Sequence, residues 1–160
     1  MKKIRVLFVC LGNICRSPAA EGVLIHQIRQ AGLTDRIEVD SAGTGTWHLG
    51  KSADPRMLNA SAKRGIHLPS ICRQITKEDF CEFDWIIPMD ADNLKNVTEI
   101  RPENATAALV PMKDFIKSRE VAGIPDPYFG GPEGFELVLD LLNEGCKNLL
   151  QNICEKRGLV

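Results

Sequence analysis

The chain has 160 residues, of which 44% are hydrophobic and 26% are charged, so it can bury a sizeable core in one domain, which we expect to span residues 1–160. Its net charge of −1 excludes the strongly basic surface that binds nucleic acid or an anionic membrane. Six scattered cysteines do not make a disulfide scaffold, and there is no run of about 18 apolar residues. We therefore expect a cytoplasmic protein whose partners include neither nucleic acid nor a membrane.

Apolar segments with two different spacings alternate along the chain. Four continuous or alternating runs predict strands, at residues 4–9, 37–40, 84–88 and 107–110. Three runs with helical spacing predict helices, at residues 20–31, near residues 55–64 and at residues 135–153. The longest irregular stretch, residues 118–134, contains three prolines and four glycines.

This alternation predicts an α/β fold. We expect a single-domain, three-layer αβα arrangement around a central four-stranded parallel sheet, Rossmann-like or flavodoxin-like. Ligands of such sheets bind beyond the carboxyl ends of the strands. The segment that follows the first strand, residues 10–17, lies at this edge.

That segment reads Cys-Leu-Gly-Asn-Ile-Cys-Arg-Ser and places Cys10 six positions before Arg16. The intervening residues, including the permissive Gly12, allow the backbone to curl so that successive N–H groups point at one phosphate-sized anion. Ser17 and Pro18 suit the N-cap and first position of a helix whose positive end faces the same anion. The planar guanidinium of an arginine can hold two phosphoryl oxygens.

The same positive surroundings favour the thiolate form of Cys10, which is the nucleophilic form of cysteine. A thiolate at the floor of an anion-binding loop is an arrangement for phosphoryl transfer. The alternative is structural, since a cysteine that ends a buried strand is usually a small hydrophobic residue. Strand, glycine-containing loop and helix start together favour the catalytic interpretation.

Further segments, in one order along the chain, carry a family resemblance. They are residues 9–18, Asp40-Ser41-Ala42-Gly43-Thr44, Trp47, Asp54-Pro55-Arg56, Arg73-Gln74-Ile75, Met89-Asp90 and Asp126-Pro127-Tyr128. With them the chain resembles, nearly end to end, the low-molecular-weight protein tyrosine phosphatases. The resemblance implies hydrolysis of phosphotyrosine in a protein substrate through a phosphocysteine intermediate. It also implies inorganic phosphate as the product, and neither metal nor cofactor.

The resemblance assigns three catalytic residues, with Cys10 as the nucleophile, Arg16 as the phosphoryl-binding group and Asp126 as the general acid. Asp126 stands between Pro125 and Pro127, whose fixed φ angles limit where its carboxyl can move. It would protonate the leaving tyrosyl oxygen and then activate the water that hydrolyses phosphocysteine. Pro-Asp-Pro by itself is ordinarily a turn, so the family match carries this assignment.

The resemblance also predicts supporting roles. Asn13 and Ser17 match loop organisers, the Ser17 hydroxyl being able to donate to the Cys10 sulfur, and Ser41 matches a further member of that network. Trp47 and Tyr128 match aromatic walls that receive the phenyl ring. The residues expected to bind substrate are Leu11, Gly12, Asn13, Ile14, Cys15, Ser17, Trp47 and Tyr128.

Two positions depart from the family pattern. Ser70 stands where many relatives carry a histidine, so we expect no histidine support of the loop. Tyr128-Phe129 replaces a frequent pair of tyrosines.

Two other functions remain open from the sequence. Arsenate reduction shares the fold and loop, but its thioredoxin-coupled members need two more cysteines just after the third strand, and residues 86–106 contain none. A redox-sensing phosphate-binding module is the other, because the family forms a protective disulfide between cysteines placed like Cys10 and Cys15. The retention of Cys10, Arg16 and Asp126 together favours an active enzyme.

Overall fold

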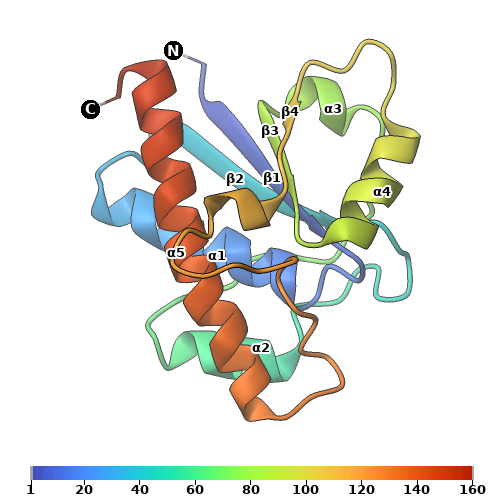
Figure 1. Ribbon diagram of the computed structural model, residues 1–160, viewed down its shortest axis with the longest axis vertical. Coiled ribbons are helices and arrows are strands. Elements are labelled where there is room, and N and C mark those ends of the chain that lie inside the picture. The colour runs from blue at the N-terminus through green and yellow to red at the C-terminus, as the bar shows by residue number, and fades with distance from the viewer. Residues whose placement is uncertain (1, 160) are drawn as a thin grey trace.

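The computed structural model describes residues 2–159 and contains a four-stranded parallel sheet flanked by helices (Figure 1). In chain order the elements are β1 (Ile4–Cys10), α1 (Arg16–Gln30), β2 (Ile37–Gly43), α2 (Pro55–Ala62), α3 (Asp79–Glu82), β3 (Trp85–Pro88), α4 (Ala91–Ile100), β4 (Ala108–Leu109), the 3-10 helix η1 (Met112–Phe115) and α5 (Pro132–Arg157). The predicted α/β fold with its parallel sheet is confirmed.

The strands lie in the order β2-β1-β3-β4, with β1 paired to β2 on one side and to β3 on the other. The chain therefore moves outward in opposite directions from β1. In open α/β sheets, such a reversal leaves a crevice at the carboxyl ends of the central strands, where ligands bind. Cys10, the last residue of β1, lies at this crevice and pairs in register with Gly43 of β2.

Side chains of β1 alternate between two buried layers, as a central strand covered on both faces requires. Val6 and Phe8 belong to the core cluster that includes α1 and α5, whereas Leu7 and Val9 belong to the cluster that includes α3 and α4. Figure 1 shows α1 and α5 together on one side of the sheet and α3 and α4 on the other. The rigid sheet thus holds the loop after β1 between two packed layers.

Several boundaries differ from the predicted ones, and two of these differences concern the segments around Cys10. β2 continues to Gly43 rather than ending at Asp40, because its small residues are buried and stay in register with Phe8, Val9 and Cys10. The prediction that Ser17 caps α1 is wrong, since the helix begins at Arg16 and Cys15 occupies the N-cap without a side-chain hydrogen bond. The Ser17 hydroxyl instead faces the Cys10 sulfur.

The sequence pattern did not indicate α3, α4 or η1. In α4 the buried residues are Asn93 and Val97, too few to form an apolar stripe along the sequence. Its start is defined by Asp90, whose carboxylate accepts a hydrogen bond from the Asn93 backbone N–H at 2.7 Å. Within residues 2–159, no helix combines the length and apolar character needed to cross a membrane.

Candidate active site

The loop between β1 and α1 curls around the sulfur of Cys10. Cys10 is buried, and its Sγ accepts a hydrogen bond from the Asn13 backbone N–H at 3.3 Å and lies 3.0 Å from Ser17 Oγ. Asn13 has a φ of 55°, the only positive value among the non-glycine residues from 2 to 159. Asparagine tolerates this left-handed conformation better than most residues, so the chain can turn back over the sulfur.

The buried side chain of Asn13 ties three separate segments to this loop. Its Nδ2 donates to Ser17 Oγ at 2.8 Å and to Ser41 Oγ at 3.0 Å. Its Oδ1 accepts from the Arg73 backbone N–H at 3.0 Å. The structure therefore brings Asn13, Ser17 and Ser41 together, and it adds Arg73, to which the sequence assigned no role.

The end of β2 approaches the loop closely because Gly43 has no side chain. A Cβ at Gly43 would lie 2.8 Å from the Leu11 carbonyl oxygen and 3.1 Å from Asn13 Cβ. Beyond it, the Thr44 and Gly45 N–H groups donate to the carbonyls of Cys10 and Leu11, each at 2.9 Å. These bonds fix the first residues of the loop to the segment that follows β2.

Arg16, at the start of α1, is 3% exposed and held from two directions. Its Nη1 donates to Asp90 Oδ2 at 2.5 Å and to the Ile124 carbonyl at 3.1 Å, and its Nη2 lies 3.7 Å from Asp126 Oδ2. Burial opposes its positive charge, but the neighbouring Cys10, Asp90 and Asp126 outweigh burial and raise the pKa of Arg16. The guanidinium is therefore a fixed cation in the pocket.

Asp90 is a functional candidate that sequence reasoning missed. It lies in the segment Met89-Asp90, to which the sequence assigns no role, yet it orients Arg16 with one carboxylate oxygen and caps α4 with the other. The available signal was its position, since an acid two residues after the end of the third strand lies at the same carboxyl edge as Cys10.

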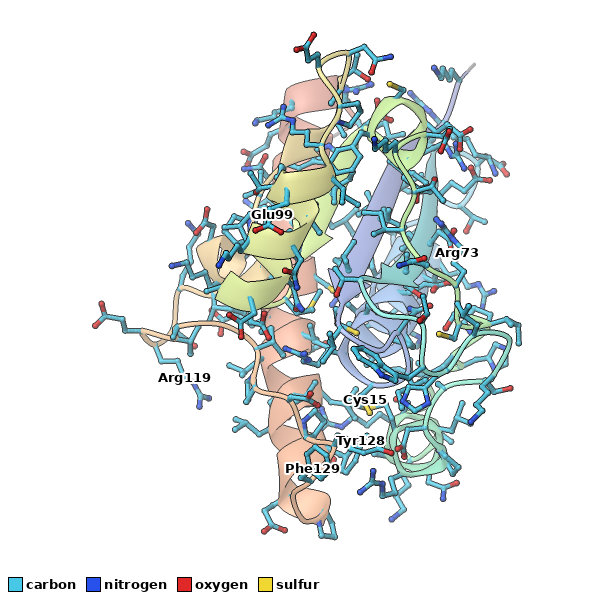
Figure 2. The ribbon with its side chains drawn as sticks, turned by 90° about the vertical axis from the view of Figure 1, so that its right-hand side faces the viewer. Cys15, Arg73, Glu99, Arg119, Tyr128 and Phe129 are labelled. Carbon is cyan, nitrogen blue, oxygen red and sulfur yellow. The ribbon has the colours of Figure 1, made fainter. Side chains whose placement is uncertain are left out.

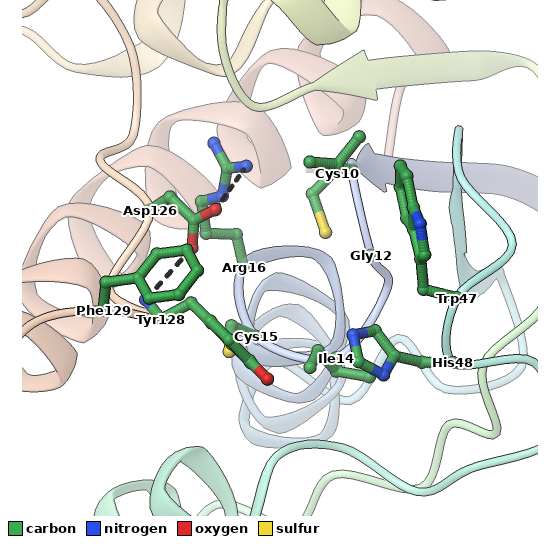
Figure 3. A pocket seen from close by; sticks show the side chains of 11 residues that line it. Cys10, Gly12, Ile14, Cys15, Arg16, Trp47, His48, Asp126, Tyr128 and Phe129 are labelled. Carbon is green, nitrogen blue, oxygen red and sulfur yellow. Dashed lines mark hydrogen bonds and ion pairs between the residues drawn. The ribbon is translucent and has the colours of Figure 1, made fainter.

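A pocket of about 190 Å³ opens above Cys10. In Figure 3, Trp47 and His48 stand on one side of the Cys10 sulfur, and Asp126, Tyr128 and Phe129 stand on the other. The rest of the lining comes from the loop and the start of α1, namely Leu11, Gly12, Ile14, Cys15 and Arg16. Predicted residues from three distant segments thus share one cavity, and His48 and Phe129 are additions.

Aromatic rings form the two walls of this pocket. Trp47 is 69% exposed and Phe129 is 95% exposed, which is unusual for large apolar side chains in a folded protein. Phe129 packs edge-on against Tyr128 with ring centroids 4.9 Å apart, and the Arg56 guanidinium lies 5.3 Å from the Tyr128 centroid. Figure 2 shows Tyr128 and Phe129 near Cys15 on this face of the molecule.

The cysteines near the loop differ from Cys10 in their surroundings. Burial raises the pKa of Cys15 to about 12, and Asp54 and Cys10 add to the effect, so Cys15 stays a neutral thiol. Cys72 is also buried, and its thiol donates to the Gly12 carbonyl at 3.1 Å. Its closeness to the loop was not expected from the sequence.

Residues 5–158 match the model of the family described as low molecular weight phosphotyrosine protein phosphatase. The chain belongs to this family. It is therefore a protein tyrosine phosphatase, a hydrolase that acts on phosphoproteins, and the resemblance seen in the sequence is confirmed. A low molecular weight phosphotyrosine protein phosphatase of Schizosaccharomyces pombe is 40% identical over 153 residues, which cover 95% of this chain and 98% of the relative.

Solved structures show the same phosphatase architecture. A crystal structure of a protein tyrosine phosphatase from Entamoeba histolytica, with Hepes in its active site, is 41% identical with a TM-score of 0.91, covering 99% of this chain and 100% of that one. A crystal structure described as Drosophila arginine phosphatase is 33% identical with a TM-score of 0.88, covering 94% of this chain and 98% of that one.

Proposed function

We propose that this phosphatase hydrolyses phosphotyrosine in proteins through a phosphocysteine intermediate on Cys10, with Arg16 holding the phosphoryl group and Asp126 as general acid and base. The observation that carries the proposal is that these three side chains, from β1, α1 and the loop before α5, line one pocket. We further propose that one domain, residues 1–160, carries the activity in the reducing cytoplasm, where Cys10 stays reduced.

Substrate binding relies on a cation that is already oriented. Asp90 and the Ile124 carbonyl hold Nη1 of Arg16, so the guanidinium loses little freedom when a phosphoryl group arrives. The incoming phosphoryl oxygens replace Asp126 at Nη2 of Arg16. The displaced carboxyl, whose side chain is 45% exposed, is then free to face the leaving oxygen.

The reaction proceeds in two displacements. The Cys10 thiolate forms an S–P bond as the P–O bond to tyrosine breaks, and Asp126 gives its proton to the tyrosyl oxygen. Water then forms an O–P bond and gives a proton to Asp126, while the S–P electron pair returns to sulfur. The donors at 3.0 and 3.3 Å, Ser17 Oγ and the Asn13 N–H, stabilise the released thiolate, and inorganic phosphate leaves.

The walls of the pocket support an aryl phosphate as the substrate. A flat ring fits between Trp47 and Tyr128 and carries the phosphorus atom down to Cys10. The shorter side chain of phosphoserine leaves these apolar walls without a partner. Aromatic stacking thereby selects phosphotyrosine over phosphoserine.

The test compares one peptide phosphorylated on tyrosine, serine or arginine, because a structural relative is named an arginine phosphatase. Phosphotyrosine should be hydrolysed fastest, and Cys10→Ser should abolish turnover yet still bind the phosphotyrosine peptide, because a serine hydroxyl is a far poorer nucleophile than a thiolate. Preference for phosphoarginine, or thioredoxin-dependent reduction of arsenate faster than phosphotyrosine hydrolysis, would replace the proposal. Substantial turnover by Cys10→Ser would remove the assigned nucleophile.

A further inference from the structure

Glu21, on α1, is a buried acid that the proposed chemistry does not use. Its side chain accepts a hydrogen bond from Ser41 Oγ at 2.6 Å, and the residue is 5% exposed. Ser41 in turn accepts from Asn13, Asn13 donates to Ser17, and Ser17 lies 3.0 Å from the Cys10 sulfur. A chain of three side chains therefore links Glu21 to the reactive sulfur.

Counting donors and acceptors shows in which direction each hydrogen bond between Glu21 and Cys10 is donated. An ionised carboxylate only accepts, so the single O–H of Ser41 points at Glu21 and leaves the Ser41 oxygen to accept from Asn13. The orientation of the Asn13 amide has independent support, because its Oδ1 accepts from the Arg73 backbone N–H. Both hydrogens of Asn13 Nδ2 are then donated, one to Ser41 and one to Ser17.

The same count of donors and acceptors indicates where the Ser17 O–H points. Because Ser17 Oγ accepts from Asn13, its own O–H is available for the Cys10 sulfur at 3.0 Å, which is closer than the Ala42 carbonyl at 3.4 Å. If Ser41 lost its acceptor, its O–H could turn toward Asn13. A rotated Asn13 amide would then present oxygen to Ser17 and draw the Ser17 O–H away from Cys10.

We propose that Glu21 is a positioning residue for hydrolysis of the phosphocysteine: by orienting Ser41, and through it Asn13 and Ser17, it keeps a hydroxyl donor aimed at the Cys10 sulfur as the S–P bond breaks. No proton passes along the hydrogen bonds between Glu21 and Ser17. Water supplies the oxygen and Asp126 takes its proton, while the Ser17 O–H stabilises the electron pair that returns to sulfur. The inference rests on the proposed function, since it requires the phosphocysteine.

The charges around Glu21 place its ionisation in a pH range where its proposed role can be measured. Burial raises the pKa of Glu21 to about 7, Asp40 on β2 acts in the same direction, and the Ser41 hydrogen bond and the Arg73 cation act against them. Arg73 is itself paired with Asp40 and with Asp79, at 3.0 Å in each case. Ionisation of Glu21 therefore falls in the range where the enzyme can be assayed.

The experiment separates the two displacements by rapid acid quench with a ³²P-labelled aryl phosphate. Glu21→Leu removes the acceptor for Ser41 and should slow phosphoenzyme decay roughly 10-fold, the size expected for one lost hydrogen bond, while formation changes much less. Glu21→Gln keeps a neutral oxygen acceptor, as the protonated acid does, so its decay rate should match the low-pH limit of the unmodified enzyme. In the unmodified enzyme the decay rate should gain with pH around 7, and this component should be missing in Glu21→Gln.

A matched control is Glu144→Gln, which alters an α5 carboxylate that binds the backbone of Lys117 and Ser118, away from the loop. Its decay rate should equal that of the unmodified enzyme. Glu21→Leu and Ser41→Ala should be non-additive, because they break the same chain. Additive losses, or normal decay in Glu21→Leu, would overturn the inference.

If Glu21→Leu fails to fold, the pH profile of Glu21→Gln decides alone, and a profile identical to that of the unmodified enzyme rejects the role of Glu21. The failure of the two proposals is distinguishable. Absence of any phosphoenzyme in the unmodified protein rejects the proposed function and this inference with it. If the unmodified protein forms the phosphoenzyme and the Glu21 variants break it down at the same rate, only this inference is rejected.

Discussion

Arg16 and Asp126 lie side by side at the pocket, with Arg16 Nη2 3.7 Å from Asp126 Oδ2. The arginine side chain is 3% exposed and the aspartate side chain 45% exposed, so the aspartate is the member of the pair with room to move. In the proposed mechanism, a phosphoryl group that binds Arg16 displaces Asp126 from this position. Substrate binding and the placement of the proposed general acid are thus one event.

Replacing the acid should affect substrates according to their leaving group. Proton donation contributes about 10² to 10⁴ in rate, so Asp126→Asn should slow phosphocysteine formation from phosphotyrosine by a factor in that range. An aryl phosphate whose leaving group is already a stable anion should lose much less. Single-turnover rates for one poor and one good leaving group make the comparison, with Asp140→Asn, an exposed partner of Arg64, as control. Equal losses for both substrates would remove Asp126 from the mechanism.

Shortening the phosphate-binding fork should impair both binding and catalysis. Arg16→Lys replaces a planar donor with a point charge that cannot contact Asp90 and two phosphoryl oxygens together, so kcat/KM should fall about 10²-fold or more. Inhibition by inorganic phosphate should weaken in parallel, which an inhibition constant measures. Near-normal values of both quantities would show that Arg16 does not contact the phosphoryl group.

Peroxide should inactivate the enzyme reversibly if Cys15 captures oxidised Cys10. Peroxide converts the Cys10 thiolate to a sulfenic acid, and the Cys15 thiol then forms a disulfide with release of water. Thiol reductant should restore activity in the unmodified enzyme and much less in Cys15→Ser.

Cys72 provides the control for this experiment, because it is a second buried thiol beside the loop. Cys72→Ser should recover as the unmodified enzyme does, and mass spectrometry should find Cys10 joined to Cys15. Equal recovery in Cys15→Ser, or a Cys10–Cys72 disulfide, would reject the pairing.

Glu21 should also make the free energy of unfolding depend on pH. Burial raises its pKa from 4.5 to about 7, so the folded protein holds this proton more tightly than the unfolded chain does. The resulting stabilisation is complete below pH 4.5 and is lost as pH rises through about 7. Urea unfolding across this range should show the free energy of unfolding falling with pH in the unmodified protein, relative to Glu21→Gln. Parallel curves for the two proteins would contradict a raised pKa.

Much of the architecture follows from local patterns. The apolar run before Cys10 identifies β1, because a strand buried on both faces needs no polar alternation. The spacing of Cys10, Gly12 and Arg16 predicts the curled loop over the Cys10 sulfur, because such a loop and the start of its helix are made by consecutive residues. Local patterns are weaker where burial is sparse, as in α4, and where a buried strand is built from small residues, as at the end of β2.

The partners of these residues were decided by the tertiary structure. The sequence presents Ser17 as a helix cap, whereas the fold brings Cys10 and Asn13 to its hydroxyl and gives it another task. Asp90 and Asp126 reach Arg16 only because β3 and the loop before α5 end beside the carboxyl edge of β1.

The sequence by itself thus determined the α/β layers and pointed to Cys10 as the proposed nucleophile, because each depends on residue types at short spacing or on local periodicity. The anchoring of Arg16 and the link from Glu21 to Cys10 depend on strand order and helix packing. Those bring side chains that are far apart in the chain within hydrogen-bond distance of each other, which no local pattern records.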